Sequence, residues 1–425
     1  MKNIIKKGLL FIVVFILIFR PEFTFIPFGI NRFFGLLGLL VFYYDKKTRM
    51  VICNSANISF RPFFILLLPS LLWSFISLVL NQTSDLYFPK YVISMFLAFF
   101  GAYMMAWGFV KVYGNVQCKR LAEYLIVGCV LYTIIALLCF INPDLLVLLN
   151  SIQRIDEIAE MSMSTTEGTR LIGIGANFFT SAIVNGTILI LLGVSAAVYR
   201  YSTAKKFMLL VAFAIISVLG LMLARTSMFG MLIGGCFLLL SFANSLKNFF
   251  QTIFASILFI CAAFMIIPAL VSNFAYEAEI LISFGFEMFI NKIQGGDMES
   301  HSMLRLYEMW ATVPHNMETW IFGDGLWSGK NGYYMNVDLG YLRHIWYFGL
   351  IGTIFLFRYY YLTLKLIFWR KKLFAPKHKF LTLGLFAFTL ILNTKGPCDL
   401  FIYIIPFYFC SDALSKSILA KHIKE

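Results

Sequence analysis

Four arginines are the residues of this chain whose type and setting point most directly to chemistry. They are Arg170, Arg225, Arg305 and Arg343, and each stands in or beside a polar segment that separates long apolar runs. A guanidinium donates hydrogen bonds in a planar fork and keeps its charge, which suits a phosphate or pyrophosphate group. The alternative is that each arginine reaches the phosphates of membrane lipids. Taken together, the four predict one shared anionic ligand.

Two other side chains could accept a proton from a substrate. Asp338 lies just before an apolar run, and His315 lies in a polar segment. A carboxylate or an imidazole in such a place can act as a general base. Asp338 could instead cap the helix that follows it, and His315 could be an ordinary surface histidine. Both are kept as candidate catalytic residues.

Four further positions are candidates for substrate contact. Tyr341 stands in the same short segment as the predicted base, where a catalytic or sugar-binding role and a plain structural role are both open. Gly323 and Gly325 belong to a tight turn that could cradle a ligand or could be only a turn. Lys395 lies in another short turn and could contact a phosphate or be a plain loop lysine.

The composition excludes an ordinary cytosolic enzyme. Hydrophobic residues make up 60% of the 425 positions and charged residues 13%, against about 25% charged in soluble domains. The mean hydropathy is +0.82. No P-loop, HExxH, GxSxG or Asp-x-Asp pattern occurs, so neither a metal site nor a nucleotide-sugar donor is expected. The eight cysteines lack a CxxC pair and mostly lie in apolar runs, where they are expected to be small core residues.

Twelve apolar runs predict about twelve membrane-spanning helices. A span needs about 20 apolar residues. The runs are roughly 4–19, 25–44, 62–80, 91–110, 121–141, 176–199, 207–224, 227–244, 249–271, 340–363, 380–394 and 399–415. The seventh and eighth together would form about 57 Å of helix, too long for one crossing, so a tight turn is predicted at Arg225.

The basic residues predict which side of the membrane each loop faces. With the N-terminus in the cytoplasm, about two thirds of the 35 basic residues fall on the cytoplasmic side, as the positive-inside rule requires. Both termini are then cytoplasmic. The net charge of +14 is explained by topology, so no nucleic-acid partner is predicted.

Two outward segments hold most of the polar sequence. They are 142–175 and 272–339, the second lying between the ninth and tenth predicted helices. The second contains many Phe and Trp residues, which a solvated linker would lack. We therefore expect an all-α membrane bundle formed by residues 1–425 as a single domain, with 272–339 folded into helices over its outer, periplasmic face.

Four stretches of the chain resemble the Wzy-type O-antigen polymerases of the wider O-antigen ligase and polymerase superfamily. The stretches are Arg170-Leu-Ile-Gly-Ile-Gly-Ala-Asn177, Ala224-Arg225-Thr226, Trp320-Ile-Phe-Gly-Asp-Gly325, and Asp338-Leu-Gly-Tyr341 leading into Tyr347-Phe-Gly-Leu-Ile-Gly352. The resemblance makes Asn177 a further candidate for substrate contact. The ligase branch tends to have a histidine near the end of the large loop. Asp338 stands there in this chain, which favours a polymerase.

The resemblance implies a reaction, a location and partners. The substrates would be glycans on undecaprenyl pyrophosphate at the periplasmic face of the bacterial inner membrane. A hydroxyl of one repeat unit would attack the anomeric carbon of the growing glycan, and the lipid pyrophosphate would leave. No cofactor or metal is implied, since arginines can neutralise the diphosphate. Membrane lipids are further partners, and a polysaccharide chain-length regulator is a partner that the sequence leaves open.

Three rival functions stay open at this point. A lipid-linked oligosaccharide flippase has similar length and span number, but it would place charges along a central cavity. An ion-coupled transporter would need broken helices near the middle of the membrane. An O-antigen ligase would share the topology and the donor. The concentration of polar residues in one outer loop favours the polymerase.

Overall fold

The structure is a computed structural model of the chain, and helices form nearly all of its regular structure. It describes residues 2–26, 28–56, 58–154, 170–175, 178–242, 275–296, 301–329 and 332–411. Within these ranges the sheet structure is one two-stranded hairpin, of β1 (Ser328–Gly329) and β2 (Gly332–Tyr333). The expectation of an all-α fold is confirmed.

Six helical segments in the described ranges are long and apolar enough to cross a membrane, by length and composition. They are α4 (Arg61–Leu80), α5 (Tyr87–Tyr113), α6 (Cys118–Ile141), α9 (Phe178–Val198), α10 (Thr203–Leu223), and α16 (Gly340–Leu364) continued by the π-helix η3 (Lys365–Trp369). Shorter apolar helices are α2 (Ile30–Tyr44), α7 (Pro143–Ile152), α11 (Ser227–Phe242) and α17 (His378–Asn393). The chain is thus a multi-pass membrane protein.

The predicted apolar runs and the observed helices agree in most places. Besides the helices above, α1 (Lys2–Phe19) and α18 (Phe401–Tyr408) also lie on predicted runs, although α18 is much shorter than 399–415. The run 249–271 lies outside the described residues. Two helices were not predicted, α7 and α3 (Lys46–Ala56). The figure of twelve crossings therefore stays a prediction.

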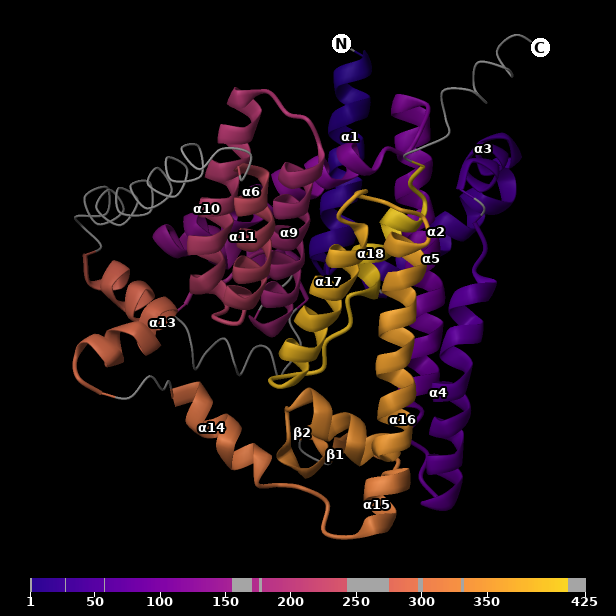
Figure 1. Ribbon diagram of the computed structural model, residues 1–425, viewed down its shortest axis with the longest axis vertical. Coiled ribbons are helices and arrows are strands. Elements are labelled where there is room, and N and C mark those ends of the chain that lie inside the picture. The colour runs from indigo at the N-terminus through magenta and orange to yellow at the C-terminus, as the bar shows by residue number, and fades with distance from the viewer. Residues whose placement is uncertain are drawn as a thin grey trace. The chain divides into compact units, whose positions relative to one another are not determined.

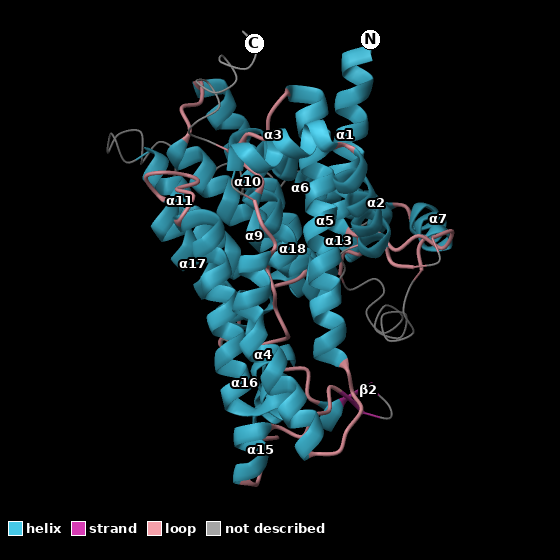
Figure 2. Ribbon diagram, turned by 90° about the vertical axis from the view of Figure 1, so that its right-hand side faces the viewer, coloured by secondary structure: helices cyan, strands magenta, loops and turns pink. Residues whose placement is uncertain are grey.

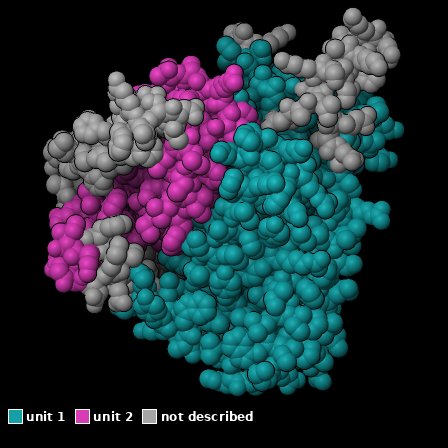
Figure 3. All heavy atoms as spheres, viewed as in Figure 1, with its two compact units in different colours: residues 1–17, 31–121, 302–425 teal, residues 18–30, 122–301 magenta. Residues whose placement is uncertain are grey.

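The chain divides into two compact units, coloured separately in Figure 3. Unit 1 comprises Met1–Leu17, Asn31–Leu121 and Ser302–Glu425, and unit 2 comprises Ile18–Ile30 and Ala122–His301. A single domain of 425 residues was expected from the sequence. Each unit is described by itself below.

Unit 2 is built around α9, whose side chains from Ser181 to Ala196 are all buried. Glycines let α11 approach this helix closely. A Cβ atom added at Gly230 would lie 2.1 Å from the Cα atom of Gly186. Small residues at such crossings allow helix backbones to pack tightly where no water drives association.

The turn expected at Arg225 is present. Helix α10 ends at Leu223 and α11 begins at Ser227. The Ser227 hydroxyl donates to the carbonyl oxygen of Ala224 at 2.8 Å and stabilises the start of α11. The segment after Arg170 contacts the end of α10 next to this turn. Leu171 N donates to Met222 O at 3.2 Å.

In unit 1, helix α16 is broken near its first third. Phe348 has non-helical dihedral angles, and Gly349 has a φ of +66°. The break frees backbone carbonyls, and each finds a donor. Trp346 O accepts from Asp324 N at 2.7 Å, Tyr347 O accepts from Ser77 Oγ at 2.8 Å, and Phe348 O accepts from the Trp73 indole at 2.9 Å. These bonds replace the missing helical ones, as an apolar setting requires.

The segment 272–339 contains the helices that the sequence predicted and a hairpin that it did not. Its helices are α13 (Ala275–Ile293), α14 (His301–Trp310), α15 (Met317–Phe322) and the short 3₁₀ turn η2 (Tyr334–Asn336). In unit 1, α15 and the hairpin lie at the opposite end from α3 (Figures 1 and 2). That end also holds the start of α16.

Helix α3, at the other end of unit 1, is held by the Asp45 carboxylate. Asp45 accepts from Lys111 Nζ at 2.8 Å, from the Trp107 indole at 2.9 Å and from Thr48 N at 3.0 Å. The Lys111 ammonium and these further donors hold the pKa of Asp45 well below its usual range. The carboxylate therefore stays ionised at neutral pH, and its contribution to stability is lost only as the pH falls below the ordinary range of an aspartate.

The orientation of the chain can be tested by labelling single cysteines in a cysteine-free variant. We expect residues in the basic turn 370–379 to react only after the inner membrane is opened, because the positive-inside rule places them in the cytoplasm. Residues 328–333 of the hairpin should react in intact cells with a permeable outer membrane. External labelling of the turn 370–379 would overturn the topology.

Candidate functional site

The candidate residues fall into two groups, one in each unit. Unit 1 holds Arg305, His315, Gly323, Gly325, Asp338, Tyr341, Arg343 and Lys395. Unit 2 holds Arg170 and Arg225. Asn177 lies outside the described residues.

Arg343 forms the centre of the unit 1 group because aromatic rings cover its guanidinium. The guanidinium carbon lies 4.0 Å from the centre of the Trp327 ring and 3.8 Å from that of Tyr333. The far face of Trp327 stacks on Tyr87, with ring centres 3.8 Å apart and planes at 7°. The four side chains therefore form one stack. Cation–π contacts of this kind are worth about 1 kcal/mol each and fix the plane of the guanidinium.

The stack leaves the edge of the Arg343 guanidinium poorly satisfied. Only 7% of the side chain is exposed, and its Nε atom has no hydrogen-bond partner among the described residues. The nearest carboxylate oxygen, of Asp338, lies 3.8 Å from NH1, longer than a hydrogen bond. The Tyr333 side chain also hydrogen-bonds to the guanidinium, so Nε is the donor left unused. A buried cation with an unused donor is costly, and an anion entering this edge would supply the missing acceptor.

Asp338 combines partial exposure with nearby positive charge. Its side chain is 53% exposed, so a substrate can reach it. Desolvation raises the pKa of Asp338, while the charges of Arg343, Lys395 and Arg305 act in the opposite direction. Desolvation is the largest of these influences, so the pKa of Asp338 lies above its usual range, which makes the carboxylate a stronger base.

Asp85, just before the first residue of α5, holds the stack in place by hydrogen bonds. Asp85 Oδ2 accepts from Trp327 N at 2.8 Å, and Oδ1 accepts from Tyr87 N at 3.1 Å. The Tyr347 hydroxyl donates to the Asp85 carbonyl oxygen at 2.8 Å. One residue thus positions two of the aromatic rings that carry Arg343.

His344 lies beside the stack and was not among the residues chosen from the sequence. Its ring centre is 5.5 Å from that of Trp327, and the ring stacks parallel to Phe348 at 5.9 Å. The side chain is 4% exposed, and the Asn393 side chain is a polar neighbour of its ring. His344 is thus a second buried polar group beside Arg343.

Gly323 and Gly325 belong to the turn that fills the break in α16. A Cβ atom at Gly323 would lie 2.5 Å from Phe348 N, and one at Gly325 would lie 2.5 Å from the Thr83 hydroxyl. Between them, Asp324 accepts from Thr319 Oγ1 at 2.6 Å and from the Tyr334 hydroxyl at 2.9 Å. These contacts explain both glycines by packing alone.

The remaining candidates of unit 1 differ in how they are held. The Tyr341 hydroxyl donates to Leu390 O at 2.9 Å, which ties α16 to α17. Arg305 and His315 are both exposed. Lys395 acts electrostatically on Asp338. Of these, Lys395 and Arg305 add positive charge around the predicted base, whereas the contacts of Tyr341 are structural.

Unit 2 brings Arg170 and Arg225 together. Arg225 NH1 makes an ion pair with Glu287 Oε2, and its guanidinium carbon lies 4.5 Å above the Phe284 ring. Arg170 stacks on Phe178 at 3.8 Å, and its Nε atom has no partner among the described residues. Burial, with a smaller effect from the charge of Arg225, lowers the pKa of Arg170 to about 10. The Arg170 guanidinium therefore stays charged at neutral pH.

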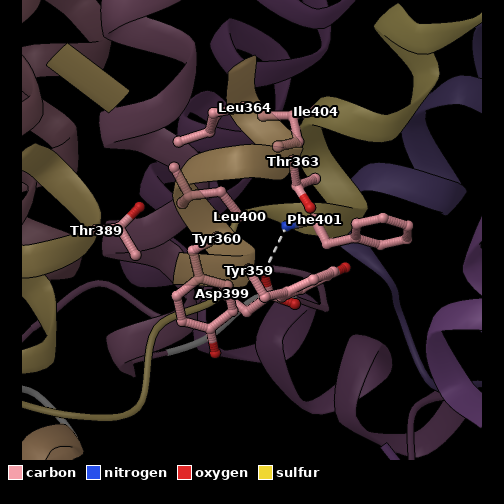
Figure 4. A pocket seen from close by; sticks show the side chains of 9 residues that line it. All are labelled: Tyr359, Tyr360, Thr363, Leu364, Thr389, Asp399, Leu400, Phe401 and Ile404. Carbon is pink, nitrogen blue, oxygen red and sulfur yellow. Dashed lines mark hydrogen bonds between the residues drawn. The ribbon is translucent and has the colours of Figure 1, made fainter. Parts of the chain in front are cut away.

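A small pocket in unit 1 contains none of the candidate residues. Figure 4 shows its lining, which comes from α16, α17, α18 and the two residues before α18. Asp399 accepts from Phe401 N at 2.8 Å, the dashed bond in that figure, and from the Tyr91 hydroxyl at 2.7 Å. No group of three or more His, Cys, Asp or Glu that could hold a metal occurs in the part of the chain described here.

Comparisons of the chain with protein-family models, with curated proteins and with solved structures found no match.

Four functional candidates were missed in the sequence: Trp327, Tyr333, His344 and Glu287. His344 could have been found, because it directly follows Arg343. The two aromatic residues belong to a hairpin too short to leave a periodic pattern. No sequence pattern pointed to Glu287, since its role depends on Arg225, which lies 62 positions away in the chain.

Proposed function

We propose that this chain is an O-antigen polymerase of the Wzy type, which lengthens a glycan carried on undecaprenyl pyrophosphate at the periplasmic face of the bacterial inner membrane. The observation that carries the proposal is the stacked, buried Arg343, whose unsatisfied edge lies beside a half-exposed carboxylate. Such an edge suits an anionic leaving group. The carboxylate suits an attacking hydroxyl.

The proposed reaction exchanges one bond for another at the anomeric carbon. The acceptor hydroxyl oxygen attacks that carbon, and the bond from the carbon to the diphosphate oxygen breaks. Asp338 accepts the hydroxyl proton, and Arg343 stabilises the charge that develops on the leaving diphosphate. The energy comes from the donor's own diphosphate bond. Lys395 and Arg305 increase the positive charge around the departing group.

The reaction needs two anion sites, because donor and acceptor each carry a diphosphate. Unit 2 contains a candidate anion site of its own, the pair Arg170 and Arg225, separate from Arg343 of unit 1. The pair fits this role because both guanidinium planes are fixed on aromatic rings, at 3.8 Å and 4.5 Å. A planar fork fixed in this way donates to two phosphate oxygens at once.

A flippase is the alternative, and the break in α16 is the observation that favours it. Transporters often place broken helices at their binding sites. In this chain the carbonyls of the break already accept from Asp324, Ser77 and Trp73. The break is therefore occupied by the protein itself, which favours the polymerase.

The proposal is tested by supplying lipid-linked repeat units to the purified protein in detergent. A polymerase should form longer glycans there without a nucleotide, because both substrates already carry their energy. A flippase cannot give that result, since detergent solution has no two compartments to transport between. Absence of longer glycans, with folded protein and intact repeat units, would contradict the proposal.

Glu287 is expected to compete with the substrate for Arg225. Replacing Glu287 by Gln removes the competing charge and keeps the shape, so the KM for lipid-linked glycan should fall by about threefold to fivefold, the range for a partly exposed ion pair. The matched control is Glu279→Gln, an exposed residue on the same helix. A KM that stays unchanged in Glu287→Gln, or that falls equally in both variants, would contradict this role.

A further inference from the structure

The end of α16 and the turn that follows it gather positive charge without any acidic residue. The segment 365–380 contains no Asp or Glu, and its cations are Lys365, Arg370, Lys371, Lys372, Lys377 and Lys379. None of them forms an ion pair with an acidic group in the described part of the chain. Like charges held this close repel one another. An anion from outside the chain would relieve that repulsion.

Two of these lysines converge on one indole ring. The ammonium groups of Lys365 and Lys379 each lie 5.3 Å from the centre of the Trp369 ring. They are therefore no farther apart than twice that distance. A phosphate placed between them lies within reach of both flexible side chains. Tryptophan is also the residue that most favours the boundary between lipid headgroups and acyl chains.

An exposed apolar ring continues the same surface. Phe380 is 63% exposed, and Lys377 Nζ lies 5.9 Å from its ring centre. Cations beside exposed aromatic rings match a molecule that is anionic at one end and apolar at the other. This combination distinguishes a lipid from a soluble anion.

Lys371 differs from Lys365 and Lys379 because it anchors the turn to the rest of the protein. Its ammonium donates to the Tyr408 carbonyl oxygen and lies 4.0 Å above the Tyr408 ring, so it contacts the end of α18. Burial lowers the pKa of Lys371 to about 8. Lys365, partly exposed, and Lys379, exposed, remain available to a ligand.

We propose that the segment 365–380 binds the phosphate headgroup of an anionic phospholipid. Lys365 and Lys379 would contact the phosphate, and Trp369 and Phe380 would contact the glycerol and the first acyl carbons. This site lies roughly 35 Å along the helix from Arg343, given a rise of 1.5 Å per residue. It is thus independent of the proposed polymerase activity.

The test measures phospholipid binding by the purified full chain in a neutral detergent. Phosphatidylglycerol should raise the melting temperature and survive native mass spectrometry, and phosphatidylcholine should do neither. Lys365→Gln and Lys379→Gln should each weaken phosphatidylglycerol binding by about fivefold. The matched controls are the single variants Lys46→Gln and Lys47→Gln, because each removes one charge from an exposed helix surface and should bind normally.

Three results would overturn the proposal. Equal weakening in the Lys46 and Lys47 controls would show general charge attraction without a site. Inorganic phosphate giving the same thermal shift as the lipid would show a soluble-anion site. Failure of Lys365→Arg/Lys379→Arg to bind phosphatidylglycerol as the wild type does would show that the lysines matter for folding only. If the Gln variants do not fold, Lys365→Arg/Lys379→Arg still tests the proposal.

Discussion

Arg343→Lys is expected to slow glycan elongation by about ten- to a hundredfold. Lysine keeps the charge and can still lie over Trp327 and Tyr333, but it loses the planar fork that donates to two oxygens. Losing charge-assisted hydrogen bonds worth about 1.5–3 kcal/mol accounts for that factor. Arg343→Ala should be worse, because it also removes the charge. The measurement is the elongation rate at matched membrane abundance.

The matched control for Arg343 is Arg358→Lys, an exposed arginine on the same helix, which should elongate at the wild-type rate. Arg305 makes a second comparison, because it is also exposed and should lose less than threefold on conversion to lysine. Arg170→Lys and Arg225→Lys should resemble Arg343→Lys, since their guanidinium planes are also fixed on rings. A wild-type rate in Arg343→Lys would show that the residue supplies charge alone.

Gly349→Ala is expected to lower the free energy of unfolding by at least about 3 kcal/mol. Gly349 has a φ of +66°, where alanine is strained by about 1–2 kcal/mol. Its Cβ atom would lie 2.1 Å from Ile321 O, so the turn after α15 must move away from α16. The bonds from that turn to the Trp346 and Tyr347 carbonyls would then weaken, and each buried carbonyl left unpaired costs about 1–3 kcal/mol.

This loss is measured by heating the purified variant and recording how much of its size-exclusion peak remains at each temperature. The control is Gly8→Ala, because a Cβ atom at Gly8 meets nothing within 4 Å. Alanine there should be neutral or slightly stabilising, since it favours the helix. Equal stability of Gly349→Ala and the wild type would show that the break in α16 does not depend on this contact.

The membrane helices could be predicted because their signal is local. An apolar run of about 20 residues has one stable arrangement in lipid, and the turn at Arg225 followed from length alone. The short α18 could not be predicted, because the run 399–415 is apolar well beyond Tyr408. The break in α16 depends on donors from Asp324, Ser77 and Trp73, which no local pattern reveals.

The candidate site could be predicted only in part, and for a physical reason. Arginine among apolar residues is unusual enough to be noticed in the sequence, which led to Arg343. What makes Arg343 distinctive is its stack with Trp327, Tyr333 and Tyr87, and Tyr87 comes from a helix in a distant part of the chain. Gly323 and Gly325 were chosen as candidates because the sequence cannot distinguish a structural turn from a ligand cradle. The structure explains both glycines by packing.

The most direct test of the proposed polymerase activity is the surface glycan of a strain that lacks this protein. The account predicts that the strain carries single repeat units on its lipid core, and that the wild-type gene restores the long ladder on a gel while Arg343→Ala does not. Loss of every surface repeat unit in the deletion strain would contradict the account, because that result indicates a flippase or a ligase.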